Sequence, residues 1–100
     1  MKDITKLTKQ LGNKDSGTRQ SAAELLGSTE DERVIDALIP VLKDENRFVR
    51  QEAVLALKKI GGSRAVEHLN QALNTEKNEF VRDFIRLALG RLQRKESAST

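Results

Sequence analysis

The sequence predicts an all-α solenoid, a stack of three helix hairpins, and two observations support this prediction. The first is an internal repeat, in which Arg19, Arg50 and Arg82 recur at intervals of 31 and 32 residues. The second is the helical periodicity of each unit, where apolar residues recur at i, i+3 and i+7. Repeated pairs of amphipathic helices bury a continuous core by stacking on one another.

Each unit begins with an apolar stripe typical of an amphipathic helix. The three stripes, at 31-residue offsets, are Ile4/Leu7/Leu11, Ile35/Leu38/Leu42 and Val66/Leu69/Leu73. A second helix is then predicted from a capping residue four positions before each arginine, namely Asp15, Asn46 or Asn78. The side-chain oxygen of such a residue accepts hydrogen bonds from the free N–H groups of the first helical turn.

Glycines are expected to mark the ends of the second helices, at Gly27, at Gly61 and Gly62, and more weakly at Gly90. Pro40 lies inside the third predicted helix and should kink it. The helices are predicted near 3–12, 16–27, 32–43, 46–60, 63–74 and 78–93. We therefore expect one domain over 1–95, with repeats at about 3–27, 32–60 and 63–93, followed by a disordered tail at 96–100.

Composition excludes several classes of protein. Apolar residues make up 37% of the chain and charged residues 33%, while cysteine is missing, so a disulfide framework and a cysteine-based metal site are both excluded. We expect a cytoplasmic protein, and no apolar run approaches the length of a membrane span. The net charge of +3 is spread along the chain, which argues against nucleic-acid binding. The three phenylalanines, Phe48, Phe80 and Phe84, are expected at or beside core positions.

No constellation for catalysis, cofactor binding or metal binding is found in the sequence. His68, the single histidine, follows Glu67, but a metal site needs three or four convergent ligands. No serine has a histidine and a carboxylate to activate it. We expect no catalytic residue, no metal and no cofactor, and hence a protein that is not an enzyme.

The central second helix carries a family pattern: Asn46, then Val49-Arg50, Ala53, Ala56-Leu57 and Gly61. It resembles the short HEAT-like repeats of phycobilisome lyases, which also occur in many bacterial and archaeal scaffold proteins. The resemblance covers roughly residues 3–93. It implies a right-handed α–α superhelix whose second helices line the concave surface. It does not fix a function, because the family includes lyase subunits, adaptors, DNA-repair enzymes and a hydroxylase.

A binding face follows from the helical phase of the second helices, at 100° per residue. Val49, Ala53, Ala56, Leu57 and Ile60 are expected on the core side of the central one, and polar residues flanked by Val54 and Leu55 on the opposite, concave side. The predicted partner-binding residues, with Leu87 beside them, are Gln20, Glu24, Arg47, Gln51, Lys58, Asp83 and Arg86.

Mixed charge and apolar area on this face suit a protein partner, so the leading prediction is a protein–protein interaction scaffold. An accessory subunit or chaperone of an enzyme such as a bilin lyase is the alternative, and a structural fragment or an engineered stack stays open. The state of association is expected to be a monomer or a weak homodimer, with dimerisation favoured if Phe84 lies on the outer side.

The arginine ladder, Arg19, Arg50 and Arg82, is expected to have a structural role. Equal spacing on equivalent helices places each arginine on the same flank, facing a neighbouring repeat. The guanidinium fork suits carboxylates or helix-end carbonyls in the adjacent unit.

Overall fold

The computed structural model describes residues 3–98, with side chains for 3–94, and all the regular structure in that range is helical. The α-helices and the two short 3₁₀ helices, η1 and η2, are, in chain order, α1 (Ile4–Gln10), α2 (Ser16–Ser28), η1 (Glu32–Val34), α3 (Ile35–Leu38), η2 (Ile39–Lys43), α4 (Arg47–Ile60), α5 (Ser63–Thr75) and α6 (Glu79–Ala98).

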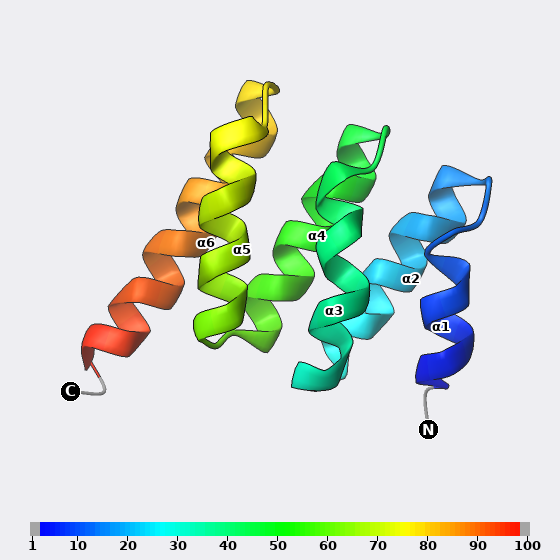
Figure 1. Cartoon of the computed structure of the whole chain (residues 1–100), viewed down its shortest axis with the longest axis horizontal. Helices are drawn as coiled ribbons and strands as arrows, with labels where there is room; N and C mark the ends of the chain where they lie inside the picture. The colour runs from blue at the N-terminus through cyan, green and yellow to red at the C-terminus, as the bar shows by residue number, and fades with distance from the viewer. Residues whose placement is uncertain (1–2, 99–100) are drawn as a thin grey trace.

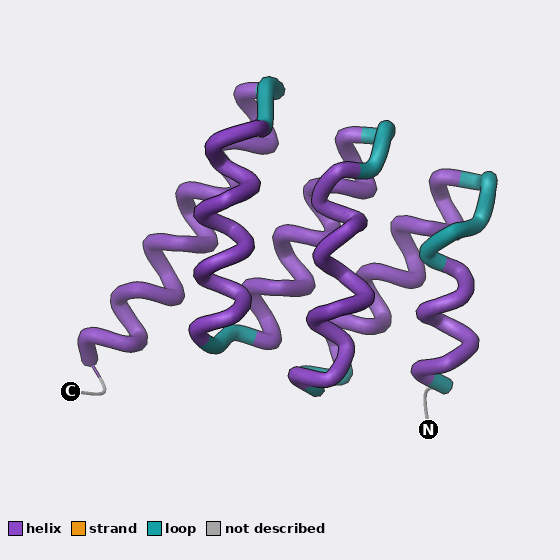
Figure 2. The backbone as a smooth tube through the Cα atoms, viewed as in Figure 1, coloured by secondary structure: helices purple, strands orange, loops and turns teal. Residues whose placement is uncertain are grey.

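The helices form two layers. Figure 1 shows α1, α3 and α5 side by side in one layer, with α2, α4 and α6 behind them in the second. Each hairpin lies beside the next along the chain, joined by short loops at alternating ends (Figure 2). The stack measures 39 × 33 × 15 Å, which is two helices thick. The predicted α-solenoid is confirmed.

Capping residues begin the second-layer helices. The Asp15 side chain accepts from Thr18 N–H at 2.9 Å, and Asn46 accepts from the N–H groups of Phe48 and Val49. Asn78 accepts from the N–H groups of Phe80 and Val81 in the same way. These bonds satisfy amides that the first turn of a helix leaves without partners.

The third helix departs from the prediction of a single kinked helix over 32–43. It is divided into η1, α3 and η2, and Pro40 lies in the first turn of η2. Proline removes a backbone donor and its ring clashes with the preceding turn. The chain therefore changes from α to 3₁₀ geometry at Ile39 instead of continuing as a bent α-helix.

The last helix is longer than predicted. Gly90 does not end it, and α6 continues through residues 96–98, where a disordered tail was expected. Residues 99 and 100 lie outside the described range. A glycine ends a helix when the chain adopts a left-handed conformation there, and such a conformation occurs at Gly61, with φ of 74°, but not at Gly90.

The core lies between the two layers. Its largest fully buried side chains are Leu26, Ile35, Leu38, Leu57, Leu69, Ile85, Val34, Val49, Val54 and Val81. Helices α2 and α4 approach closely at Gly27, where a Cβ atom would lie 2.7 Å from the Cα and Cβ of Ala56. Gly27 does not end α2, which continues to Ser28. Its role is to let two repeats approach closely.

Candidate partner-binding face

We call the surface of α2, α4 and α6 that faces away from the first layer the outer face. On α4 the helical phase separates fully buried residues such as Val49 and Leu57 from exposed or half-buried Arg47, Gln51 and Lys58. The residues of the outer face used below are Gln20, Glu24, Arg47, Phe48, Gln51, Leu55, Lys58, Phe80, Asp83, Arg86 and Leu87.

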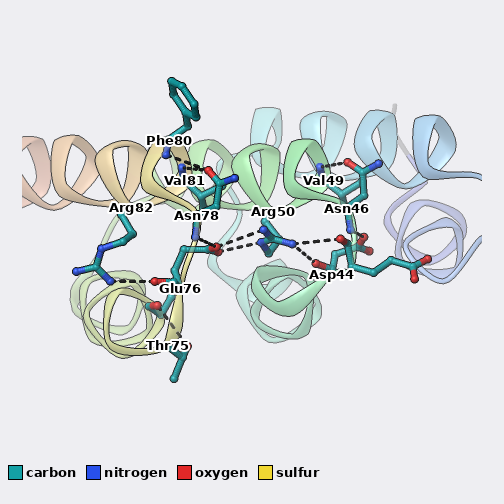
Figure 3. A network of polar contacts seen from close by, with 12 residues as sticks. Asp44, Asn46, Val49, Arg50, Thr75, Glu76, Asn78, Phe80, Val81 and Arg82 are labelled. Carbon is teal, nitrogen blue, oxygen red and sulfur yellow. Dashed lines mark hydrogen bonds and ion pairs between the residues drawn. The ribbon is translucent and has the colours of Figure 1, made fainter.

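Two of the three phenylalanines are exposed on this face, contrary to the expectation that they lie at or beside the core. Phe48 is 50% exposed and Phe80 66% exposed, while Phe84 is half-buried against the core. Figure 3 shows Phe80 extending from α6 on the side away from α5. Each exposed phenylalanine immediately precedes a buried valine, and consecutive residues of a helix point 100° apart. Helical phase could therefore have shown that both rings lie outside the core.

Arg47 connects the two rings. Its Cζ atom lies 4.8 Å from the ring centroid of Phe48 and 5.5 Å from that of Phe80, within the range of cation–π attraction. Because Phe80 belongs to the next repeat, this cluster spans the junction of α4 and α6. Leu87, 72% exposed, extends the apolar area along α6.

Gln20 and Glu24 lie at the other junction, between α2 and α4, beside Glu52. Burial raises the pKa of the Glu52 carboxyl, and repulsion from Glu24 raises it further, while hydrogen bonding by Gln20 and attraction to Lys59 oppose these effects. The part of the outer face nearest α2 is therefore acidic and polar, whereas the part near Arg47 is cationic and aromatic.

The other predicted residues are spread across the face. Asp83 and Arg86 form an exposed ion pair at 3.0 Å on α6. Gln51 and Lys58 are half-buried on α4. Val54, expected at the edge of the groove, is fully buried and contributes nothing to this surface.

The ladder arginines contact the residues between repeats. Arg19 donates through Nε to Asp44 Oδ2 at 2.8 Å and through Nη2 to Asp44 Oδ1 at 3.0 Å. Arg50 donates to the two carboxylate oxygens of Glu76 at 2.9 and 3.2 Å (Figure 3). In both cases Nη1 also donates to two backbone carbonyls in the loop that precedes the helix of the arginine. These are the carbonyls of residues 13 and 14 for Arg19 and of residues 44 and 45 for Arg50.

Arg82 repeats only half of this arrangement. Its Nη1 donates to the carbonyl oxygens of Leu73 at 2.6 Å and Glu76 at 2.9 Å, and no carboxylate among the side chains of residues 3–94 pairs with it. The structural role that the sequence predicts for all three arginines stays a prediction; Arg19 and Arg50 have the carboxylate partners it requires, and Arg82 has backbone carbonyl partners.

Burial raises the pKa of Asp44, but the hydrogen bonds donated by Arg19 and by the N–H of Asn46, together with attraction to the charges of Arg19 and Arg50, outweigh that effect. The net result is a pKa below the ordinary value for aspartate. The charged form is therefore favoured where the two repeats meet.

The described residues show no group of three or more His, Cys, Asp or Glu side chains that could hold a metal ion. His68 is half-buried and lines a shallow hollow between η2 and α5, with Ile39 and Leu42 among its other lining residues. Over the same range, no helix is long and apolar enough to cross a membrane.

Comparison with known proteins identifies the repeat. HEAT repeats match residues 4–96, and no curated protein matches the chain in sequence. Among solved structures, an engineered protein from the Northeast Structural Genomics Consortium is similar, with a TM-score of 0.67 and 26% identity over 91% of this chain. The chain spans 45% of the length of that engineered protein. The family match covers nearly the whole sequence, and the chain belongs to the HEAT repeat family.

Proposed function

We propose that this protein is a non-enzymatic scaffold that binds a partner protein on the outer face of α2, α4 and α6. HEAT repeats are generally protein-interaction scaffolds and typically lack enzymatic activity. The observation that carries the proposal is the exposed cluster of Arg47, Phe48 and Phe80. Aromatic residues and arginine are enriched at protein interfaces, and clusters of them account for most of the binding energy.

The chemistry of the cluster suggests which side chains the partner contributes to the interface. Phe48, Phe80 and Leu87 offer apolar area that gains stability when water leaves it, at about 25 cal/mol per Å². Arg47 offers a guanidinium oriented by two rings, which suits a carboxylate. A partner segment with an apolar side chain next to an acidic one fits both. In longer stacks the corresponding face is concave, so such a segment would lie along it.

The test compares affinity capture from the source cell by three proteins. The parent and a Leu25→Ser control should capture the same partner, because Leu25, although 39% exposed, is not in the cluster. The double variant Phe48→Ser/Phe80→Ser should lose that partner. Circular dichroism must show that all three are folded. A partner that the double variant retains at full affinity would refute the proposed face.

The alternative role, an accessory subunit or chaperone of an enzyme such as a bilin lyase, derives from the resemblance to the repeats of phycobilisome lyases. No feature of the structure favours it over a general adaptor. The identity of the captured protein separates the two roles, since a bilin-related enzyme would support the alternative. The cytoplasmic location and the state of association both stay predictions.

A further inference from the structure

Arg82 is the third arginine of the ladder, and the pairs Arg19–Asp44 and Arg50–Glu76 show which ligand its free donors could bind. At Arg19 and Arg50, Nη1 is held by backbone carbonyls while Nε and Nη2 grip the two oxygens of a carboxylate. That carboxylate, Asp44 or Glu76, comes from the loop that precedes the second helix of the next repeat. The geometry is bidentate and charge-assisted, the strongest form of arginine–carboxylate hydrogen bonding.

Arg82 makes the same contacts between Nη1 and backbone carbonyls, but its Nε and Nη2 donors are available to a ligand. Its Nη1 is fixed by the carbonyl oxygens of Leu73 and Glu76, while its Nε and Nη2 have no hydrogen-bond partner among the described side chains. In Figure 3 the Arg82 side chain points away from Arg50, whose own fork reaches toward Glu76. The guanidinium is half-buried and already oriented, so a ligand would lose little arginine side-chain entropy on binding.

We propose that Arg82 and Arg86 form a site at this end of the stack that binds two carboxylates of an acidic, extended segment of a partner protein. Arg86 follows Arg82 by four residues, which places the two side chains one above the other, with Cβ atoms about 5–6 Å apart. Alternate residues of an extended segment point to the same side and are about 6.6 Å apart. Acidic residues at i and i+2 match that spacing.

The occupant is an extended segment and not a further helical repeat. Ala23 and Val54 occupy the positions equivalent to Arg86 in the first two repeats, and both are fully buried. Arg86 is exposed and pairs with Asp83. A repeat packed as closely as the internal ones would bury this charge, at a high cost in desolvation. An exposed ion pair contributes little stability, so Arg86 can exchange Asp83 for an incoming carboxylate.

A second copy of this chain does not supply the ligand either. At the opposite end of the stack, the residue equivalent to Asp44 and Glu76 is Asn13, six positions before Arg19. Its amide has a single oxygen and cannot accept from Nε and Nη2 as a carboxylate does. Head-to-tail association would therefore leave the Arg82 fork unmatched.

The test is a nuclear magnetic resonance titration of the arginine Nε–H signals with a capped peptide, acetyl-Gly-Glu-Ala-Glu-Gly-amide, in which the two glutamates supply all the carboxylates. The Arg82 signal should shift in a saturable manner, and the matched peptide with Gln in place of Glu should leave it unchanged. Arg82→Lys should weaken binding about tenfold, because lysine keeps a charge and a donor but lacks the fork.

Arg91→Lys is the matched control, because Arg91 is exposed on the opposite side of α6 and should leave the affinity for the peptide unchanged. If the chemical shift of the Arg82 Nε–H signal did not change on adding the glutamate peptide, the proposal would be overturned without the need for any variant. It would also be overturned if sodium acetate at equal carboxylate concentration shifted Arg82 as strongly, which would indicate general anion binding. A shift on raising protein concentration alone would show a second copy as the occupant. Arg86 belongs to this site and was also predicted on the outer face, but the cluster of Arg47, Phe48 and Phe80 that carries the outer-face proposal has its own test, so each proposal can fail without the other.

Discussion

At the scale of single residues, Arg19 and Arg50 connect adjacent repeats through side-chain hydrogen bonds. Each side chain ties the loop before its own helix to a carboxylate of the following repeat, so one residue orients two units. The carboxylate is well shielded in both cases, with 11% of the Asp44 side chain and 7% of the Glu76 side chain exposed. Shielding from water strengthens such a pair and also makes it costly to break.

Removing Arg50 should destabilise the stack. Arg50→Ala removes the guanidinium donors of Glu76, which keeps only the N–H of Asn78, and leaves the carbonyl of Asp44 without its donor, so the expected loss in the free energy of unfolding is about 1–3 kcal/mol. Urea denaturation measures it. Arg33→Ala is the control, because Arg33 pairs with Asp31 while 84% of its side chain is exposed, and its unfolding midpoint should stay at the parent value. An unchanged midpoint for Arg50→Ala, together with a sharp fall in partner affinity, would instead show that Arg50 is a binding residue.

At the scale of elements, periodicity and capping residues were sufficient to place the helices, because both signals are local. The errors arose where a glycine or a proline has several possible effects. Gly27 and Gly90 both lie inside helices, and the sequence alone does not distinguish a helix end from a close contact. Pro40 could bend a helix or convert it to 3₁₀ geometry, and the same local sequence is compatible with either; the structure has the 3₁₀ helix η2.

The two helical glycines should respond to alanine in opposite directions. Gly27→Ala places a Cβ atom 2.7 Å from Ala56, and overpacking of this kind costs about 1–3 kcal/mol. Gly90→Ala meets no heavy atom within 4 Å in α6, and its higher helix propensity should stabilise the protein by about 0.5–1 kcal/mol. Thermal and urea unfolding of the two variants check both signs. If both variants shifted the same way, the assigned role of Gly27 as a contact would be wrong.

At the scale of the whole molecule, the buried core and the proposed recognition surface occupy different sides of the second-layer helices. The surfaces between helices hold the apolar core, and the outer face holds a cationic and aromatic cluster beside an acidic patch. The sequence predicted from helical phase that Arg47, Gln51 and Lys58 point away from the core of α4, and these side chains are exposed or half-buried there. It did not reveal that Arg47 and Phe80 meet, because that contact joins two repeats and depends on how they stack.

Charge reversal across the outer face should separate folding from recognition. The variant Arg47→Glu/Lys58→Glu/Arg86→Glu changes exposed or half-buried side chains, each worth no more than about 0.5 kcal/mol of stability, so it should unfold near the parent midpoint. Its affinity for the captured partner should nevertheless fall sharply, because like charges facing one another across an interface cost several kcal/mol.

Titration calorimetry of the parent and this variant with the captured partner measures the loss, and Lys43→Glu provides the control. Lys43 is exposed at the end of η2, in the first layer, and its reversal changes the net charge without touching the outer face. It should leave the affinity at the parent value, since exposed charges farther apart than about 10 Å are largely screened at ordinary salt. If the triple variant bound normally while Lys43→Glu abolished binding, recognition would belong to the first layer, and the aromatic cluster around Arg47 would have to be reinterpreted as a contact that only holds α4 against α6.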